Sequence, residues 1–335
     1  MKTPHMRELP RDGAPTGTSQ KLLVMTYNVL AQCYVRSSFF PYCKSSELRW
    51  KNRSKNLEAV FASSLPVSPD VICLQEVDSY DEFWAAAMKR LGYEGSDAAM
   101  LVSLLRCSEW FLFVKKTSTK PDGVAVFWNE KKLKVKGSKQ VSLDLPNGDE
   151  SDIDHELLSR ASTRGSVGAI VHFEHLKTQL ELVVATTHLF WDPMQEDVKL
   201  LQVRRMLRTI EEFTSTLDPS TPTIFSGDFN SLPDSKVYSF ITSKNHFSSA
   251  YAQYNSDGEP KFTNVNGDAE TDDGKMVPRF VGTLDYIFYR SPRMRPAALM
   301  ELMSFEDASK EVALPSTISP SDHLPLLCEF HINHM

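Results

Sequence analysis

Residues 180–188 read LELVVATTH, residues 197–217 read DVKLLQVRRMLRTIEEFTSTL, and residues 223–230 read TIFSGDFN. The first segment is a continuous apolar run with β-branched residues, which predicts a strand covered on both faces. The third segment opens with a second run of this kind. The segment between them carries apolar residues at helical spacing: Val198, Leu201, Val203, Leu207, Ile210 and Phe213. This succession predicts an α/β fold.

Further runs of strand length recur along the chain, each bounded by polar or turn-forming residues. They cover residues 22–26, 71–74, 124–128, 167–173, 284–289 and 324–330. Helical patterns lie between them, at residues 46–65, 79–91 and 235–242. Asp78 and Asp234 precede two of these segments and are predicted to act as helix N-caps. Strands and helices therefore alternate along the chain, as in a layered α/β architecture.

The composition is that of an ordinary globular protein. The chain has 335 residues, of which 41% are hydrophobic and 24% are charged. Its length alone suggests about two domains. Residues 1–20 are polar and contain Pro and Gly, so we expect a disordered lead-in followed by the folded part at residues 21–335. No stretch approaches the ~18 consecutive apolar residues of a membrane span, and no signal-peptide core is visible, so no contact with a membrane is expected.

The charge balance limits the kind of partner. Lys and Arg total 37 against 43 Asp and Glu, which gives a net charge of −6. A protein that binds duplexes by neutralising phosphates would normally be basic, so simple non-specific nucleic-acid binding is disfavoured. A nucleic-acid enzyme that meets phosphate through a metal remains compatible with this charge. The five cysteines form no C-x-x-C pair, so we expect buried, reduced thiols and an intracellular, cytoplasmic location.

Polar residues gather at the ends of the predicted strands. The residue types are those that bind metals or transfer protons, and they are Asn28, Glu76, His188, Asp228, Asn230, Asp285, Asp322 and His323. Ligand sites in α/β proteins favour strand ends, so we expect these side chains to converge on one crevice. Because they run from one end of the chain to the other, both halves must build that crevice, which favours a single domain.

The residue types in this set indicate metal-assisted hydrolysis of a phosphate ester. Carboxylate and amide oxygens suit Mg²⁺ or Mn²⁺ rather than Zn²⁺. The sequence contains no HExxH motif, no phosphate-binding P-loop and no G-x-S-x-G elbow. In such a reaction the metal neutralises phosphate, a carboxylate positions or deprotonates water, and a protonated histidine offsets charge in the transition state.

Several motifs occur in one order along the chain. They are YNVLAQ (27–32), LQEVD (74–78), KPDGVAVFW (120–128), TTHLFWDP (186–193), SGDFNSLPDS (226–235), GTLDYIFY (282–289) and SDHLPL (321–326). Together they resemble the endonuclease/exonuclease/phosphatase superfamily. Within it they resemble the CCR4-type deadenylase branch, to which nocturnin, the Angel proteins and the 2′,5′-phosphodiesterase also belong. This resemblance implies a single-domain, four-layer α/β sandwich, in which two packed mixed β-sheets are flanked by helices.

The resemblance also implies roles for individual residues. Asn28 and Glu76 would hold the metal site, with Asp322 on the metal side, and the cofactor would be two Mg²⁺ or Mn²⁺ ions. Asp228 and Asn230 would position the attacking water and the phosphate. His188 would contact the scissile phosphate. Asp285 would orient His323, as expected of a carboxylate that fixes an imidazole tautomer.

For substrate binding, the resemblance implies that Pro193 and Phe280 sandwich an adenine base. Trp191 belongs to the same WDP motif as Pro193, and Lys120 is a candidate phosphate contact. Stacking of this kind contributes about 1–3 kcal/mol per base. The acidic segment at residues 266–275 is an insertion that would reshape the nucleotide pocket.

The function expected from these motifs is a Mg²⁺-dependent phosphodiesterase. The favoured activity is a 3′–5′ exoribonuclease that acts on the poly(A) tails of RNA by in-line attack of water. Three related activities stay open: a 2′,5′-phosphodiesterase, an NADP(H) 2′-phosphatase and an RNA-end phosphatase. A catalytically silent scaffold protein is the alternative from another class. No leucine-rich repeat precedes the motifs, so contact with a deadenylase scaffold by that route is not expected, and a protein adaptor stays unidentified.

Overall fold

The computed structural model describes residues 4–10, 19–93, 111–117, 120–146, 148 and 150–333. Its first sheet has the strand order β1–β16–β17–β2–β3–β5–β4. The strands are β1 (Met6–Glu8), β2 (Ser19–Asn28), β3 (Val71–Val77), β4 (Phe111–Lys115), β5 (Gly123–Trp128), β16 (Met294–Met300) and β17 (Leu326–Asn333). Only β2 and β3 are parallel neighbours among these strands, so the sheet is mixed.

The second sheet has the order β10–β15–β9–β8–β7–β6 and is also mixed, because β8 and β9 are parallel. Its strands are β6 (Leu133–Ser142), β7 (Val167–His175), β8 (Glu181–His188), β9 (Thr223–Asp228), β10 (Ser248–Ser249) and β15 (Asp285–Arg290). Two small ribbons pair β11 (Asn264–Asn266) with β14 (Phe280–Gly282), and β12 (Ala269–Glu270) with β13 (Met276–Val277).

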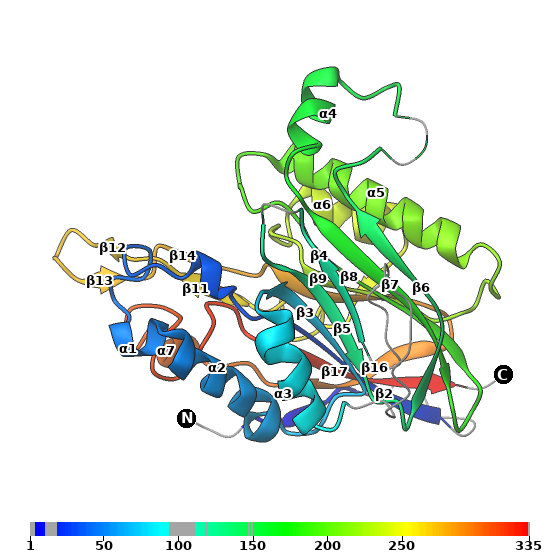
Figure 1. Cartoon of the computed structure of the whole chain (residues 1–335), viewed down its shortest axis with the longest axis horizontal. Coiled ribbons are helices and arrows are strands. Elements are labelled where there is room, and N and C mark those ends of the chain that lie inside the picture. Colours follow the sequence, from blue (N-terminus) through cyan, green and yellow to red (C-terminus); the bar gives the residue numbers. More distant parts are fainter. Residues whose placement is uncertain are drawn as a thin grey trace.

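The helices are short apart from α5. They are α1 (Ser45–Leu48), α2 (Trp50–Ala59), α3 (Ala85–Arg90), α4 (His155–Ala161), α5 (Glu196–Thr214), α6 (Lys236–Ser239) and α7 (Phe305–Ala308). Single turns of other helix types are η1 (Gln32–Tyr34), η2 (Val60–Ser64), η3 (Tyr80–Trp84) and η4 (Phe240–Lys244), of which the last three are π-helical. Figure 1 shows α5 and α6 on one outer face of the paired sheets, and α2 and α3 on the other.

The alternation of side chains along each strand explains the layers. On β2, Leu22 and Val24 pack in the core between the two sheets, whereas Met25 packs in a second core beneath α2 and α3. On β8, Val184 packs between the sheets and Val183 packs against α5. Both faces of β2 and of β8 are therefore buried. The expected four-layer sandwich of two mixed sheets flanked by helices is confirmed.

The strands predicted from the apolar runs are confirmed, but three local predictions were wrong. Part of the expected disordered lead-in is a strand, because Met6–Glu8 pairs antiparallel with β16. Asp78 does not cap the next helix, since its Oδ2 accepts a hydrogen bond from the Cys33 N–H at 3.0 Å. The N-cap of α6 is Ser235 rather than Asp234, with the Tyr238 N–H donating to the Ser235 side chain.

Two segments that were predicted as single helices are interrupted in the structure. The segment expected at residues 46–65 is divided into α1, α2 and η2, and the segment at residues 79–91 into η3 and α3. Ser79 has φ of 49°, a left-handed conformation that separates β3 from η3. The predicted burial of the cysteines is confirmed for Cys43, Cys73 and Cys328 and is wrong for Cys33, which is exposed. Cys107 lies outside the described residues.

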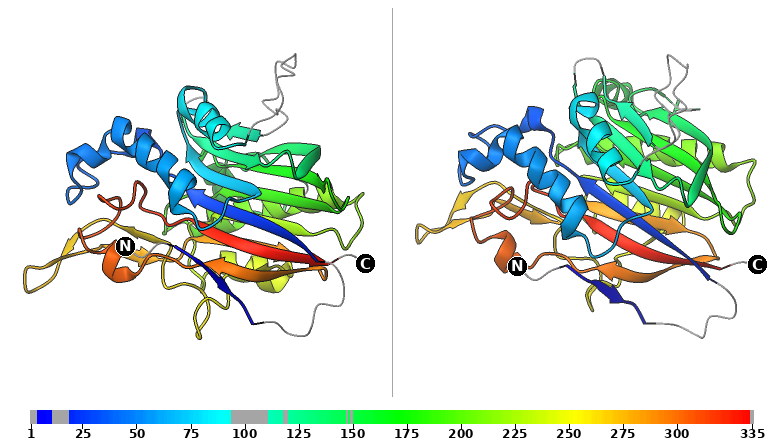
Figure 2. Two further views of the ribbon diagram at one scale, coloured as in Figure 1. Left: turned by 90° about the horizontal axis from the view of Figure 1, so that it is seen from below. Right: turned by 60° about the horizontal axis from the view of Figure 1, so that its bottom comes forward.

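The acidic insertion at residues 266–275 forms most of an arm that extends from the body of the protein. The β12–β13 hairpin lies at its tip, at the end of the molecule where α1 and α7 also lie (Figures 1 and 2). Across the part of the chain that the structure describes, no helix has both the length and the apolar character that crossing a membrane requires.

Candidate active site

The register of the second sheet places three of the expected residues side by side. His188 ends β8 and pairs with Asp228, which ends the parallel strand β9. Asp228 in turn pairs with Asp285, the first residue of the antiparallel strand β15. The hydrogen-bonded ladder therefore puts one histidine and two carboxylates in a single row across three neighbouring strands.

The first sheet supplies the facing side of the site. Asn28 ends β2 and pairs with Gln75 on β3, and Glu76 follows directly. The pairing of β3 with β5 shifts by a residue between Gln75 and Val77, and Glu76 has φ of 58°. Such a bulge re-aims a side chain that would otherwise follow the alternation of the strand. Here it allows Glu76 to reach Asn28 instead of packing in the core.

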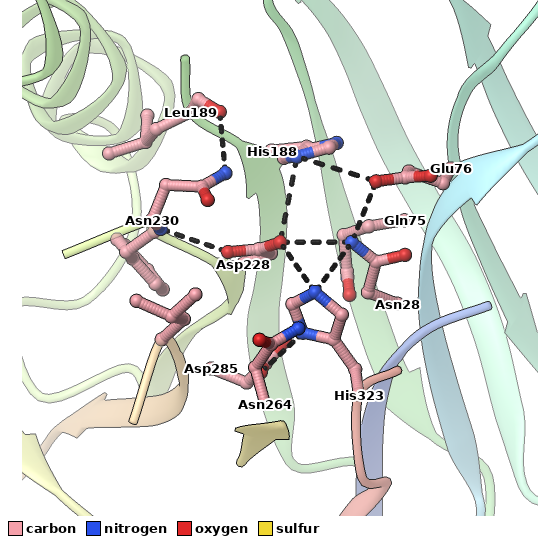
Figure 3. A network of polar contacts seen from close by, with 12 residues as sticks. Asn28, Gln75, Glu76, His188, Leu189, Asp228, Asn230, Asn264, Asp285 and His323 are labelled. Carbon is pink, nitrogen blue, oxygen red and sulfur yellow. Dashed lines mark hydrogen bonds and ion pairs between the residues drawn. The ribbon is translucent and has the colours of Figure 1, made fainter. Parts of the chain in front are cut away.

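The Asn28 amide joins the two sheets at the centre of the site (Figure 3). Its Nδ2 donates to Glu76 Oε1 at 3.0 Å and to Asp228 Oδ2 at 2.9 Å, and lies 3.5 Å from His323 Nε2. Its Oδ1 accepts from the Leu30 N–H at 3.0 Å, which fixes the orientation of the amide. The expected metal ligand Asn28 thus turns its nitrogen, rather than its oxygen, toward the two carboxylates.

His323 and Asp285 form the expected pair. His323 Nδ1 lies 2.8 Å from Asp285 Oδ2, which also accepts a hydrogen bond from Thr263 Oγ1 at 2.6 Å. Burial by itself lowers the pKa of His323, but the carboxylates of Asp285, Asp228 and Asp322 raise it well above the usual histidine value. His323 is therefore held in its charged form, with Nε2 directed toward Asp228 Oδ2 at 3.6 Å.

His188 has the opposite electrostatic environment. Burial and the positive charge of Lys116 lower its pKa well below the usual histidine value. Its Nε2 lies 3.5 Å from Asp228 Oδ2 and 4.0 Å from Glu76 Oε1. The site thus holds one neutral and one charged imidazole on opposite sides of Asp228 (Figure 3).

The carboxylates of the site are crowded in a low-dielectric environment. Burial raises the pKa of Glu76, and burial raises the pKa of Asp228 to about 7. Asp285 Oδ1 and Asp322 Oδ1 are buried without a hydrogen-bond partner among the described residues. Buried anions and unpaired carboxylate oxygens are costly unless a cation compensates them. The donor set therefore fits a hard divalent cation.

One group of ligand atoms is close enough to hold a metal ion. The atoms of Asp228, Asp285 and His323 all lie within 4.8 Å of one another, and all three residues are buried. His323 Nδ1 and Asp285 Oδ2 already contact each other, so these two atoms are not free to bind a metal ion. The three residues therefore offer fewer free lone pairs than three independent ligands would. Glu76 and Asp322 are the further carboxylates at the site.

The remaining expected residues lie around this centre. Asn230 has φ of 46°, its N–H donates to Asp228 Oδ1 at 2.9 Å, and its Nδ2 donates to the Leu189 carbonyl at 3.1 Å. Asp322 Oδ2 accepts from the Nδ2 atoms of Asn264 and Asn266, each at 3.3 Å. The sequence predicts no role for Asn264 or Asn266, which flank the start of the acidic insertion.

The expected substrate-binding residues show no direct contact with the carboxylate centre. Trp191 is 68% exposed and Pro193 is also exposed, both on the loop that follows His188. Lys120 donates to the carbonyl of Arg164. Phe280 is half-buried on β14, and its ring lies over Gly282, where a Cβ atom would come within 2.7 Å of Phe280 Cζ and 2.8 Å of Leu232 Cδ2. Phe280 therefore borders the loop that carries Asn230.

A row of carboxylates, amides and two histidines at the edge of two packed mixed sheets defines a phosphoester-hydrolysing enzyme of the α/β sandwich type. The chain belongs to the Endonuclease/Exonuclease/phosphatase family, whose model matches residues 25–323. This confirms the resemblance that the ordered motifs indicate. The chain is accordingly an enzyme of a family of hydrolytic nucleases and phosphatases.

Relatives within the family include Ccr4-type proteins. The chain is 32% identical to "Carbon catabolite repressor protein 4 homolog 4" of Arabidopsis thaliana, over 92% of this chain and 77% of that protein. It is 29% identical to the "CCR4-Not complex 3'-5'-exoribonuclease subunit Ccr4" of Yarrowia lipolytica, over 93% of this chain and 48% of that subunit. The chain thus spans about half the length of that fungal subunit.

Solved structures share the fold over nearly the whole chain. ANGEL2, described as a 2′,3′-cyclic phosphatase, superposes with a TM-score of 0.76 at 24% identity, covering 99% of each chain. The human Nocturnin catalytic domain gives a TM-score of 0.67 at 23% identity, covering 98% of this chain and 97% of that one. These similarities establish the four-layer architecture.

Proposed function

We propose that the chain is a Mg²⁺- or Mn²⁺-dependent 3′–5′ exoribonuclease that shortens adenine-rich 3′ ends of RNA. One observation supports this proposal most directly: Asp228 lies between a charged His323 and a neutral His188. Glu76 lies beside Asp228, because the Asn28 amide donates to both carboxylates. This arrangement places a base, a cationic hydrogen-bond donor and a cation-binding carboxylate around one point.

We assign the reaction as in-line attack of water on the scissile phosphodiester. A pKa near 7 suits Asp228 to accept the proton of the attacking water at neutral pH. Asn230, fixed by two hydrogen bonds, orients the phosphate. The charged His323 offsets negative charge on the phosphoryl oxygens as the bond to the leaving oxygen breaks, and Asp285 keeps the imidazole oriented.

A divalent cation would be held by Glu76 and Asp322, with Asn28 fixing the position of Glu76. When bound, it would neutralise phosphate charge and stabilise the leaving oxygen. The unpaired oxygen of Asp322 and the raised pKa of Glu76 support this assignment. The proposal includes a second ion, for which the Asp228, Asp285 and His323 group offers a candidate location.

The activity is tested with a 5′-labelled RNA that ends in an A-tail. We expect shortening from the 3′ end in Mg²⁺ or Mn²⁺, no shortening in excess EDTA, and loss of about 10²–10⁴ in rate for Glu76→Gln and His323→Ala. A suitable control is His331→Ala, since His331 pairs with Glu329 on β17 outside the site. Unchanged shortening in EDTA, or full activity of both site variants, would contradict the proposed mechanism.

The substrate class is tested with one preparation on a panel. The panel compares poly(A), other homopolymers, 2′,5′-linked oligoadenylate, cyclic-phosphate RNA and NADP. Preference for poly(A) supports the exoribonuclease assignment, whereas preference for one of the other substrates would assign a different activity to the same metal site. No turnover of any panel member would favour a silent scaffold role.

We propose that Phe280 and Pro193 hold the 3′ adenine, that Trp191 lines the same rim and that Lys120 contacts phosphate. The position of the Phe280 ring against Leu232, next to the Asn230 loop, supports this. Phe280→Ala is expected to weaken cleavage of oligo(A) by about 1–3 kcal/mol of transition-state binding. Cleavage of a small phosphodiester such as bis(p-nitrophenyl) phosphate should change little, because it has no base to stack. Equal losses on both substrates would exclude a stacking role.

RNA is the proposed partner, and an intracellular location is proposed because Cys43, Cys73 and Cys328 are buried free thiols, as is usual in a reducing compartment.

A further inference from the structure

Lys116 and Asp122 close the loop between β4 and β5 at one side of the active site. The Lys116 N–H donates to the Asp122 carbonyl at 2.9 Å, and the Lys116 Nζ lies 2.7 Å from Asp122 Oδ2. The side chains are only 8% and 0% exposed. Asp122 belongs to the KPDGVAVFW motif, in which the sequence predicts a role only for Lys120. The structure instead shows a buried ion pair.

Tyr34 completes this ion pair from the other side. Its hydroxyl donates to Asp122 Oδ1 at 2.7 Å, while Oδ2 faces the Lys116 ammonium in the ion pair. Removing a lysine and a carboxylate from water is costly, and a buried ion pair is rarely a net source of stability. The pair is therefore better explained by what the ammonium contacts next.

The Lys116 ammonium lies 3.4 Å from His188 Nδ1. An ammonium group has only donors, so Nδ1 must be the acceptor and cannot carry a proton. The ring proton of His188 then resides on Nε2. That nitrogen faces two acceptors, Asp228 Oδ2 at 3.5 Å and Glu76 Oε1 at 4.0 Å, which is consistent with an N–H at this position.

We propose that Lys116 is a positioning residue that fixes the ring orientation and tautomer of His188, so that Nε2–H points into the active site. Asp122 and Tyr34 hold the ammonium in place. The inference rests on the proposed function of this site, in which His188 contacts the scissile phosphate. His188 then serves as a hydrogen-bond donor to a phosphoryl oxygen, while the charged His323 serves on the other side of Asp228.

The first test measures the tautomer and is independent of activity. Long-range ¹H–¹⁵N spectra of the metal-free chain with ¹⁵N-labelled histidine report which ring nitrogen is protonated, and His188→Gln identifies the His188 signals. We expect the proton on Nε2 and none on Nδ1. In Lys116→Met, the signals of the two ring nitrogens should average between the two tautomers, because Nδ1 has lost its donor.

The second test separates positioning from substrate binding. If Lys116 acts through His188, Lys116→Met should lower kcat by about 10–100-fold with little change in KM, in line with other residues that orient a functional histidine. Lys116→Arg, which keeps donors at this position, should recover part of the loss. Tyr34→Phe, which removes only the hydroxyl contact to Asp122, should give a smaller loss in kcat and guards against a failure of Lys116→Met to fold.

Lys132→Met is the matched control, because Lys132 also pairs with a buried carboxylate, Asp70 Oδ1 at 2.6 Å, but lies outside the site. It should leave the His188 spectrum and kcat unchanged. The proposal is overturned if His188 carries its proton on Nδ1 in the unsubstituted chain, or if Lys116→Met leaves the His188 signals as they were. It is also overturned if Lys116→Met raises KM alone, which would make Lys116 a substrate contact. If the spectra agree but no RNA is cleaved, the proposed function fails and the positioning role stands.

Discussion

At the scale of single residues, the site depends on how each polar side chain is held by another. Asp285 illustrates this, because one of its oxygens is shared between His323 Nδ1 at 2.8 Å and Thr263 Oγ1 at 2.6 Å. Asn28 illustrates it again, since the Leu30 N–H determines which end of the amide meets the carboxylates. The orientation of the His323 ring and of the Asn28 amide thus follows from neighbouring hydrogen-bond partners.

Asp285→Asn tests this at one residue. The amide keeps the shape of the side chain but removes the charge that raises the pKa of His323 and orients its ring. We expect kcat on A-tailed RNA to fall by about 10²–10⁴, the usual contribution of a positioned acid or base, while far-ultraviolet circular dichroism stays unchanged.

Glu329→Gln is its control, because Glu329 Oε1 lies 3.0 Å from His331 Nε2 in a carboxylate–histidine pair away from the site. It should leave kcat unaltered. An Asp285→Asn enzyme with normal kcat would mean that His323 does not depend on this carboxylate.

At the scale of elements, buried polar side chains of each outer helix layer form hydrogen bonds with the backbone of the loops that carry the site. From α5, Lys199 Nζ donates to the Asn230 carbonyl at 2.6 Å, and Gln202 Oε1 accepts from the Phe190 N–H at 2.9 Å. From α2, Arg53 donates to the carbonyls of Val29, Leu30 and Pro320. The helices therefore fix the loops after β2, β8 and β9, as well as the segment before β17, in addition to covering the sheets.

Gln202→Leu tests this coupling on α5. The substitution conserves volume approximately but leaves the buried Phe190 N–H without its acceptor, which costs about 1–3 kcal/mol of unfolding free energy. Because Phe190 lies two residues after His188, kcat should also fall. Denaturant unfolding and initial rates measure the two effects.

Ile210→Val, in the core between the same helix and sheet, provides the comparison. It should cost about 0.5–1.5 kcal/mol in stability with kcat retained. If Gln202→Leu lowers stability without lowering kcat, α5 contributes to the fold but not to the placement of His188.

At the scale of the whole molecule, the two sheets pack face to face, and strand ends from both of them bring buried carboxylates together in one cluster. Asn28 on β2 and Asp228 on β9 are joined by a hydrogen bond although they are 200 residues apart in the chain. The apolar core between the sheets holds these carboxylates together despite their mutual repulsion. A cation that binds there should therefore stabilise the entire fold.

Metal removal tests this expectation. Ligand that binds only the folded state raises the unfolding free energy by RT ln(1 + [L]/Kd), or about 1.4–2.7 kcal/mol when Mg²⁺ exceeds its Kd by about 10–100-fold. We expect denaturant midpoints in Mg²⁺ to lie above those in EDTA, and this difference to shrink in Glu76→Gln.

Glu174→Gln, which removes a surface carboxylate paired with Lys136, should keep the full difference. Identical midpoints with and without the metal, in the unsubstituted chain, would argue against a cation at this site.

Much of the candidate site follows from sequence alone, because polar residues that directly precede or follow apolar runs mark strand ends. This held for Asn28, His188, Asp228 and Asp285, each of which is the first or last residue of its strand. The same reasoning failed at Asp78 and Asp234, where local capping rules competed with contacts to distant residues or with a better neighbouring cap. Short strands such as β1 and β10 carry too few residues for a pattern and exist because a longer strand pairs with them.

The sequence by itself determined the fold class and the chemical character of the site, since both arise from short-range patterns of apolar and polar residues. Tertiary structure alone decided which atoms meet. It turned the nitrogen of Asn28 toward Glu76 and Asp228, gave the two histidines opposite charge states, and brought Lys116 to His188 across 72 positions of the chain. The physical reason is that hydrogen-bond direction and pKa depend on neighbours brought together by sheet register and sheet packing, which no local pattern encodes.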